Sequence, residues 1–254
     1  MSNSNERIAL ITGATGGIGF EVAKRLGKDG FTVILNGIQD EVGAEKVRIL
    51  KEEGIKAEYF GFDVTIEKEV NLNIKNIGDK YGKIDVVVNN AGGLGGRSRF
   101  EDMTTEFYRS VMALNLDSTF FVSRSAIPYL KKSDYASIIN YTSNAGWNAG
   151  GPGAGIYGTS KAAVHTLTRA LAKDLAEYGI RVNAVSPGTI DTPFHAQIKA
   201  TKPEVFASWK NNIMLERLGQ PEEVASVVSF LAGKDSAFLT AETIQVGGGQ
   251  GLGI

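Results

Sequence analysis

RIALITGATGGIG, residues 7–19, joins a short apolar run to a turn that contains four glycines. The apolar run predicts a buried strand, and the residues after the turn have the spacing of an amphipathic helix. Gly13, Gly17 and Gly19 would let the turn tighten and bring its backbone close to a pyrophosphate at the helix N-terminus. The spacing is Gly-x-x-x-Gly-x-Gly, which differs from the Gly-x-Gly-x-x-Gly of other dinucleotide-binding folds. Strand, turn and helix together predict a dinucleotide site.

Short β-rich runs alternate with helical stretches along the rest of the chain. Strands are predicted at residues 7–12, 31–36, 57–62, 84–88, 137–141, 180–185 and 243–246, and helices at 19–28, 41–53, 67–81, 105–130, 157–178 and 221–231. This alternation predicts an α/β fold, a Rossmann-like doubly wound seven-stranded parallel sheet with helices on both faces. Because no linker or repeat interrupts it, residues 1–254 are predicted to form a single domain, with a substrate lid around residues 190–215.

Composition narrows the class of protein further. The chain has 254 residues, of which 43% are hydrophobic and 22% charged, as in an ordinary globular protein. Its net charge of −1 indicates neither a nucleic-acid partner nor a membrane partner. No signal-peptide pattern is present at the N-terminus, and no cysteine could form a disulfide or a thiolate metal site. We therefore expect a cytoplasmic protein that acts on a small molecule without a metal.

Tyr157 and Lys161 stand four residues apart at the start of a predicted helix. Residues at i and i+4 share one helix face, so the phenol and the ammonium can point into the same cleft. A nearby cation favours the phenolate and lowers a tyrosine pKa from its ordinary value of about 10. A tyrosine tuned in this way could exchange a proton with a substrate oxygen near neutral pH. An isolated Tyr-x-x-x-Lys pattern is common, so its context decides its meaning.

The ordered motifs of this chain resemble those of the short-chain dehydrogenase/reductase family over nearly the whole sequence. They are Thr12–Gly19, Asp63-Val64, Asn89-Asn90-Ala91-Gly92, Asn115, Ser143, Tyr157 with Lys161, and Pro187-Gly188-Thr189-Ile190-Asp191-Thr192. Each motif follows a predicted strand or lies in a predicted helix in the order that the family shows. The resemblance implies an NAD(P)-dependent oxidoreductase that interconverts a carbonyl and a secondary alcohol by hydride transfer.

The resemblance also assigns roles to residues. It implies that Tyr157 is the general acid or base, that Lys161 contacts the nicotinamide ribose and depresses the tyrosine pKa, that Ser143 positions the substrate oxygen, and that Asn115 holds a water in a proton relay. The cofactor-binding residues implied are Gly13, Thr15, Gly17, Ile18, Gly19, Asn36, Asp63, Val64, Asn90, Ala91, Gly92, Tyr157, Lys161, Pro187, Gly188, Ile190 and Thr192.

The choice between NAD and NADP depends on the end of the second strand. There Gly37 replaces the Asp of NAD-using relatives, and Ile38 replaces the Arg of many NADP-using ones. A 2′-phosphate would lack an evident cation and would approach Asp40 and Glu41. Either cofactor is compatible with the glycine turn, and the acidic residues favour NAD.

The substrate is less constrained by the sequence. Trp147, Phe194, His195 and Trp209 are candidate walls of the substrate pocket, and Arg97 or Arg99 could pair with a carboxylate. The pattern favours a small polar or sugar-derived carbonyl compound. The alternatives are a 3-oxoacyl-carrier-protein reductase and a non-catalytic dinucleotide-binding protein. The family usually assembles as tetramers, so the resemblance implies a homotetramer with interfaces at residues 105–130, 157–178 and 243–246.

Overall fold

The computed structural model describes residues 6–250, without the side chains of Phe194 and Gln197, and shows one parallel sheet between two layers of helices. The strands are β1 (Arg7–Ile11), β2 (Phe31–Gly37), β3 (Ala57–Gly61), β4 (Val86–Asn89), β5 (Ser137–Tyr141), β6 (Arg181–Pro187) and β7 (Thr243–Val246). They lie in the order β3-β2-β1-β4-β5-β6-β7, and every pair is parallel. The predicted doubly wound seven-stranded sheet is therefore confirmed, with its switch point between β1 and β4.

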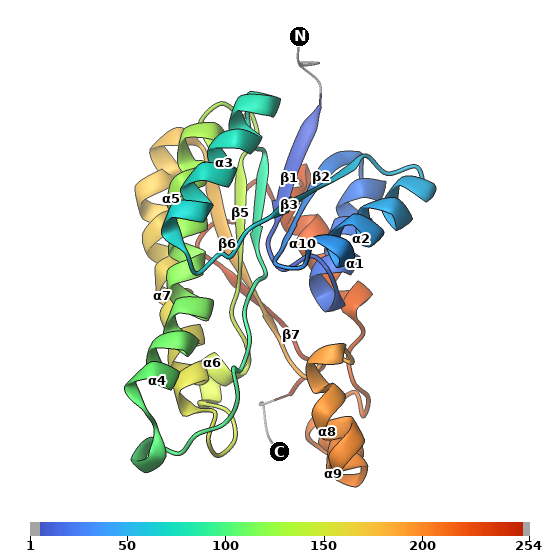
Figure 1. The fold of residues 1–254 in the computed structure, drawn as a ribbon, viewed down its shortest axis with the longest axis vertical. Helices are drawn as coiled ribbons and strands as arrows, with labels where there is room; N and C mark the ends of the chain where they lie inside the picture. Colours follow the sequence, from blue (N-terminus) through green and yellow to red (C-terminus); the bar gives the residue numbers. More distant parts are fainter. Residues whose placement is uncertain (1–5, 251–254) are drawn as a thin grey trace.

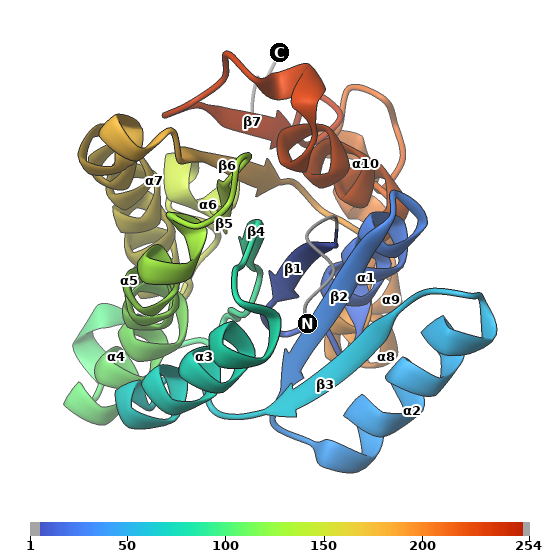
Figure 2. The same cartoon turned by 90° about the horizontal axis from the view of Figure 1, so that it is seen from above.

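The helices cover both faces of this sheet. They are α1 (Gly17–Lys28), α2 (Asp40–Glu52), α3 (Glu67–Tyr81), α4 (Thr105–Met112), α5 (Ser118–Leu130), α6 (Ala145–Asn148), α7 (Gly155–Leu175), α8 (Ala196–Thr201), α9 (Pro203–Ser208) and α10 (Pro221–Ala232). Figure 2 shows α3, α5 and α7 on one face and α1, α2 and α10 on the other. The strands β1, β2, β4 and β5 are buried along nearly their whole length because helices cover both faces of the sheet.

Two apolar clusters, one on each face of the sheet, hold these layers together. One contains Val22 and Leu26 of α1 with Val224 and Val228 of α10, and the other contains residues of α3, α5 and α7 such as Ile74. Burial of such side chains contributes roughly 1.5–3 kcal/mol each. Between residues 6 and 250 no helix is long and apolar enough to cross a membrane.

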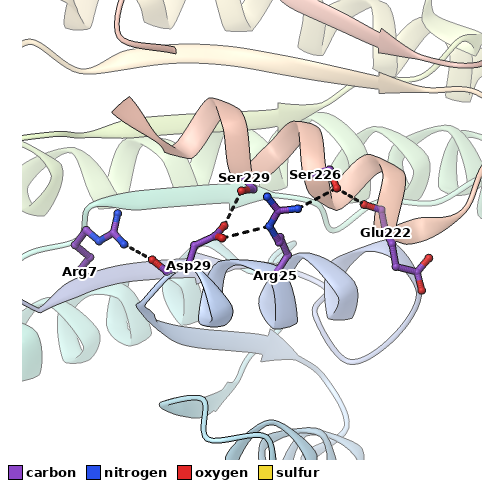
Figure 3. Close-up of polar contacts among 6 residues, drawn as sticks. All are labelled: Arg7, Arg25, Asp29, Glu222, Ser226 and Ser229. Carbon is purple, nitrogen blue, oxygen red and sulfur yellow. Dashed lines mark hydrogen bonds and ion pairs between the residues drawn. The ribbon is translucent and has the colours of Figure 1, made fainter. Parts of the chain in front are cut away.

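A polar seam runs along the exposed side of the contact between α1 and α10 (Figure 3). Arg25 donates to the Oδ1 atom of Asp29 at 3.3 Å and to the hydroxyl of Ser226 at 3.1 Å. Ser229 donates to the other Asp29 carboxylate oxygen at 2.6 Å, and Arg7 donates to the Asp29 carbonyl. The two bonds to Ser226 and Ser229 join residues 201 and 200 positions apart in sequence and hold the first helix against α10.

Two elements differ from the prediction. The single helix predicted over residues 105–130 is interrupted by a π-helical turn at Ala113–Asp117 between α4 and α5. The glycine-dense connector after β5 contains the short helix α6. Both lie at the carboxyl end of the sheet, together with α8 and α9 (Figure 1), and both shape the site described next.

Candidate active site

A cavity of about 470 Å³ opens at the carboxyl ends of the central strands. Its lining residues are Gly13, Gly16, Gly17, Ile18, Gly19, Asn90, Gly92, Leu94, Arg97, Tyr141, Thr142, Ser143, Ala145, Gly150, Gly151, Ala154, Tyr157, Lys161, Pro187, Gly188, Ile190, Thr192, Pro193 and His195. The glycine turn after β1 and the Tyr157/Lys161 pair therefore share one space, as expected at the switch point of a doubly wound sheet.

The glycine turn is held in a conformation that needs glycine. Gly13 has φ +60° and Gly17 has φ +51°, a region that residues with a side chain enter at a cost. A Cβ on Gly13 would lie 3.0 Å from the Cα of Ala91. Asn90 braces the turn because its Nδ2 donates to the Thr12 and Gly13 carbonyls at 2.9 and 3.0 Å. Backbone therefore approaches the cavity closely here.

The N-terminus of α1 meets the requirements of a pyrophosphate site. Its N-cap, Gly16, makes no side-chain cap, so the first amides of the helix lack a capping partner. Gly16, Gly17, Ile18 and Gly19 all line the cavity. Free amides and the positive end of the helix dipole favour an anion, so these residues fit a dinucleotide.

Several predicted cofactor residues lie outside this cavity lining: Thr15, Asn36, Asp63, Val64 and Ala91. Asn36 is buried, and its Nδ2 donates to the Phe62 carbonyl at 2.9 Å. Asp63 accepts from the amide and the hydroxyl of Thr65, both at 2.8 Å. For Asn36 and Asp63 the structure shows bonds that stabilise the loops after β2 and β3, and their contact with a cofactor stays a prediction.

Asn115 lies in the π-helical turn and is fully buried. Its Nδ2 donates to the Gly93 carbonyl at 2.8 Å and to the Val111 carbonyl at 2.9 Å, and its Oδ1 accepts from the Gly93 amide at 3.0 Å. The side chain thus fixes the loop after β4 against the helix. A Cβ on Gly92 would lie 2.9 Å from both Asn115 Oδ1 and Lys161 Nζ, so these two groups meet beside Gly92.

Lys161 projects from α7 into the protein and is 3% exposed. Its Nζ donates to the Tyr141 carbonyl at the end of β5, at 3.0 Å. Burial lowers the pKa of the Lys161 ammonium to about 8, since a charged group is poorly solvated there. Near neutral pH this lysine is therefore poised to exchange a proton.

Tyr157 lies on the same helix face, with the Lys161 Nζ 5.8 Å from its ring centroid. Burial raises the pKa of its phenol, and the interaction with the Ser143 hydroxyl partly offsets that rise. This differs from the expectation that Lys161 depresses the tyrosine pKa, because desolvation dominates and the ammonium is directed to the Tyr141 carbonyl. The protein alone thus holds Tyr157 as a protonated phenol, which is the form that can donate a proton.

Ser143 completes the group at the end of β5. Its Oγ accepts from the Ala145 amide at 3.2 Å, which orients the hydroxyl at the start of α6. Ser143, Tyr157 and Lys161 come from two elements yet line the same cavity. They can hydrogen-bond one oxygen atom and deliver a proton to it.

The buried ammonium predicts a measurable pH dependence of stability. The folded-state pKa of Lys161 is about 8, against 10.5 for a free lysine, so the unfolded chain binds more protons between these values. Burial of the charged lysine destabilises the folded protein by roughly 3 kcal/mol below pH 8, and this destabilisation disappears as the pH rises to 10.5. Chemical denaturation in the absence of dinucleotide should show this gain. Between pH 8 and pH 10.5 the free energy of unfolding of the unmodified protein should rise by this amount relative to that of the Lys161→Met variant. Parallel pH profiles of the two proteins would contradict the prediction.

The candidate substrate walls divide into two groups. His195 and Arg97 line the cavity, whereas Trp147, Trp209 and Arg99 do not. Trp147 packs edge-on against His165, and Trp209 packs edge-on against His195 at 5.2 Å between centroids. The side chain of Phe194 lies outside the described part of the structure. Short helices occupy the predicted lid, from Pro193 to Asn212.

Several lining residues were not among the predicted site residues, and Tyr141, Thr142 and Ala154 are three of them. Tyr141 and Thr142 directly precede Ser143 at the end of β5, and this position at the carboxyl edge could have identified them. Ala154 is buried at the N-cap of α7. The preceding Gly153 accepts from the Ser98 amide at 3.1 Å, and sequence patterns give no sign of this contact with the loop after β4.

Comparisons with known proteins agree with this geometry. Residues 13–250 match the family model described as enoyl-(acyl carrier protein) reductase. A diacetyl reductase [(S)-acetoin forming] of Staphylococcus aureus (strain Mu50) is 38% identical over 97% of this chain and 98% of its own. A 3beta-hydroxysteroid dehydrogenase of Mediterraneibacter gnavus is 36% identical over 98% of this chain and 96% of its own.

Solved structures give the same result for the fold and the family. An actinorhodin polyketide ketoreductase, solved with NADPH, superposes with a TM-score of 0.92 at 33% identity over 99% of both chains. The family model spans the glycine turn, α7 and β7. The chain belongs to the short-chain dehydrogenase/reductase family and is an NAD(P)-dependent oxidoreductase.

Proposed function

We propose that this oxidoreductase reduces a small neutral ketone to a secondary alcohol, with Tyr157 as the proton donor. The observation that carries the proposal is that Ser143, Tyr157 and Lys161 line the same cavity as the glycine turn. The dinucleotide supplies the hydride when bound. The protein supplies position, hydrogen bonds and the proton.

The roles of the residues follow from their surroundings. Negative charge develops on the carbonyl oxygen during reduction, so donors that face this oxygen stabilise the transition state more than the ground state. Ser143 and Tyr157 are these donors, and the raised pKa of Tyr157 keeps its proton available. Lys161, with a pKa of about 8, can return a proton to the phenol, and Asn115 keeps the loop at Gly92 and Gly93 beside it.

A ketone-dependent loss of reduced-nicotinamide absorbance tests this function. Purified protein is mixed with NADH or NADPH and a panel of diketones, hydroxyketones and simple ketones. Acetoacetyl-pantetheine is added to the panel to test a 3-oxoacyl thioester as the substrate. Turnover of small ketones supports the proposal, exclusive turnover of the thioester favours the carrier-protein alternative, and dinucleotide binding without turnover favours a non-catalytic protein.

The surroundings of the basic side chains in the cavity lining favour a neutral substrate. Apart from His195, these side chains are Lys161 and Arg97. Lys161 is bonded to the Tyr141 carbonyl, and Arg97 donates to the Pro152 carbonyl at 2.9 Å on the exposed side of the cavity. Lys161 is buried but directed to a backbone carbonyl, and Arg97 is exposed, so neither is placed to pair with a carboxylate in the cavity. The diacetyl reductase relative is named for a small uncharged diketone, which is consistent with this proposal.

We further propose that the preferred cofactor is NAD. The exposed Ile38 follows β2, and Asp40 and Glu41 form the acidic first turn of α2. A 2′-phosphate at this position would meet carboxylates rather than a guanidinium.

Steady-state kinetics with both cofactors measure this preference. We expect kcat/KM to be at least about tenfold higher with NADH than with NADPH, and Ile38→Arg to raise the value for NADPH by about tenfold through a new phosphate contact. Leu72→Arg, at an exposed position of α3, is the matched control and should not change the ratio. A hundredfold preference of the unmodified enzyme for NADPH would refute the assignment.

We also propose a homotetramer. β7 is an edge strand of the sheet, and the preceding Phe238 is fully exposed at 102%. Phe230 of α10 is also exposed, so apolar surface accompanies the edge. Light scattering on the eluting protein should give the mass of four chains, and Phe238→Asp should lower it, whereas Leu72→Asp on α3 should not. A monomeric unmodified protein would contradict this proposal.

A further inference from the structure

A second cavity, of about 410 Å³, adjoins the candidate active site. Six residues line both spaces: Ser143, Ala145, Gly150, Gly151, Pro187 and Gly188. Ser143 is among them, so a molecule bonded to this serine can extend from one space into the other. The second cavity is therefore placed to receive a part of the substrate beyond its reacting carbonyl.

The side chains specific to the second cavity are polar and uncharged. They are Asn144, Asn148, Thr189 and Gln250, which we call the polar annex. Its complete lining, Ser143, Asn144, Ala145, Asn148, Gly150, Gly151, Pro187, Gly188, Thr189 and Gln250, contains no acidic or basic side chain. A charged substituent would lose part of its hydration on entering this half-open cavity and would meet no counter-charge in its lining. The lining thus fits a neutral group that forms hydrogen bonds.

One wall of the polar annex is fixed by its own hydrogen bonds. The Oε1 of Gln250 accepts from the Thr189 amide at 2.7 Å, and its Nε2 donates to the Thr189 hydroxyl at 2.9 Å. A Cβ on Gly188 would lie 2.6 Å from the Gln250 Oε1 and 3.1 Å from the Asn144 Nδ2. Glycine at position 188 therefore leaves open a space that any side chain would fill.

The two asparagines of the polar annex carry hydrogen-bonding groups that have no partner in the described part of the protein. The Asn148 Oδ1 accepts a hydrogen bond from the Gly150 amide at 2.9 Å, and the Asn144 Nδ2 donates one to the Gln250 Oε1 at 3.3 Å. Among residues 6–250, no group accepts from the Asn148 Nδ2 or donates to the Asn144 Oδ1. The Asn148 nitrogen and the Asn144 oxygen therefore have no partner within the described residues, and a hydroxyl group suits them because it can both donate and accept a hydrogen bond.

We propose that the polar annex selects ketones with a neutral hydroxyl group beyond the reacting carbonyl. This inference rests on the proposed carbonyl reduction at Ser143 and Tyr157, and it adds the substrate class. Asn148 and Asn144 bind the hydroxyl, and Gly188 provides the room for it. Asn148 is exposed and Asn144 is half-buried, so water solvates both amides when no ligand is bound. A methyl group at the same place displaces this water without replacing its hydrogen bonds, which lowers the kcat/KM of that substrate.

Isosteric ketone pairs test the proposal. Hydroxyacetone is compared with butan-2-one, and 4-hydroxybutan-2-one with pentan-2-one, so that each pair exchanges a hydroxyl for a methyl group. We expect kcat/KM of the unmodified enzyme to favour the hydroxylated member of at least one pair by about tenfold, the effect of one or two neutral hydrogen bonds. Asn148→Leu should bring that ratio close to one. Asn148→Asp, which keeps the acceptor for the Gly150 amide but loses the donor, should lower it to an intermediate value.

The controls separate this inference from the proposed function. Asn76→Leu, at an exposed asparagine of α3, should keep the ratio of the unmodified enzyme. Asn144→Leu provides an independent reading if Asn148→Leu does not fold. Three outcomes would overturn the proposal for the polar annex but leave carbonyl reduction standing. They are equal turnover of both members of each pair, a ratio that the Asn148 variants do not change, and a higher kcat/KM for the charged acetoacetate than for the hydroxyketones. Absence of turnover with every ketone would instead refute the proposed function and the inference that rests on it.

Discussion

Tyr157→Phe is expected to lower kcat for ketone reduction by roughly 10²–10⁴-fold, the range typical of losing a general acid. The substitution removes a single hydroxyl and leaves the half-buried ring, so the packing of α7 is retained. The proton for the nascent alkoxide is lost, together with one of the two donors to the carbonyl oxygen. Because burial keeps the phenol of the unmodified protein protonated, the loss should be evident across neutral pH.

The measurement is steady-state turnover together with NADH affinity and thermal unfolding. NADH binding and the unfolding temperature should remain close to those of the unmodified protein. Tyr81→Phe is the matched control, since it also removes a partly buried hydroxyl, one that donates to Glu58 at 2.6 Å at the end of α3. It should cost about 1 kcal/mol of stability and leave kcat unchanged. Near-normal turnover of Tyr157→Phe would exclude this tyrosine as the proton donor.

Gly13→Ala is expected to weaken NADH binding by about a hundredfold or more, equivalent to about 2.7 kcal/mol. The new Cβ would lie 3.0 Å from the Ala91 Cα and 3.1 Å from the Asn90 Nδ2, inside the turn that faces the cavity. The backbone there has φ +60°, so the alanine must also bear the strain of a left-handed conformation. Either the turn opens or its amides leave the positions that suit a pyrophosphate.

Gly54→Ala separates strain from ligand contact. Gly54 has φ +78°, but a Cβ there would meet nothing within 4 Å, and it lies after α2 away from the cavity. Calorimetric titration should show NADH affinity unchanged in Gly54→Ala, with a loss of about 1–2 kcal/mol in stability alone. Equal NADH affinity in the two variants would show that the glycine turn does not hold the cofactor.

The strands and most helices could be predicted because burial and local pattern coincide in this fold. Residues 8–11 are apolar and lie in β1, which helices cover on both faces, and α3 ends at the predicted residue 81, before Gly82 with φ +80°. For most of the strands, the predicted boundaries differ from the observed ones by one or two residues. In β4, pairing with β5 extends the strand to Asn89, one residue beyond its predicted end.

The elements that could not be predicted depend on contacts between distant residues. The π-helical turn at Ala113–Asp117 accompanies the bonds of Asn115 to Gly93, and helical periodicity contains no sign of them. Helix α6 is four residues long in a glycine-rich segment, and its Trp147 donates to the Ser186 hydroxyl on β6. Periodicity over such a short stretch cannot distinguish a helix from a turn.

The candidate site shows the same division. Motif order indicated Ser143, Tyr157 and Lys161, and the structure brings these three to one cavity. The direction of their pKa shifts could not be predicted, because it depends on how deeply the fold buries them. The polar annex was also invisible in the sequence, since it combines the loop after β5, the loop after β6 and Gln250 near the C-terminus.

Transfer of deuterium from NADH labelled at the nicotinamide C4 position tests the central claim most directly. The two stereoisomers of the labelled cofactor are used separately with a small ketone, and the alcohol product is analysed by mass spectrometry. The account predicts that one stereoisomer gives an alcohol one mass unit heavier, with the label on the carbinol carbon, and that Tyr157→Phe forms this product far more slowly. An alcohol that carries no label with either stereoisomer would contradict hydride transfer at this site.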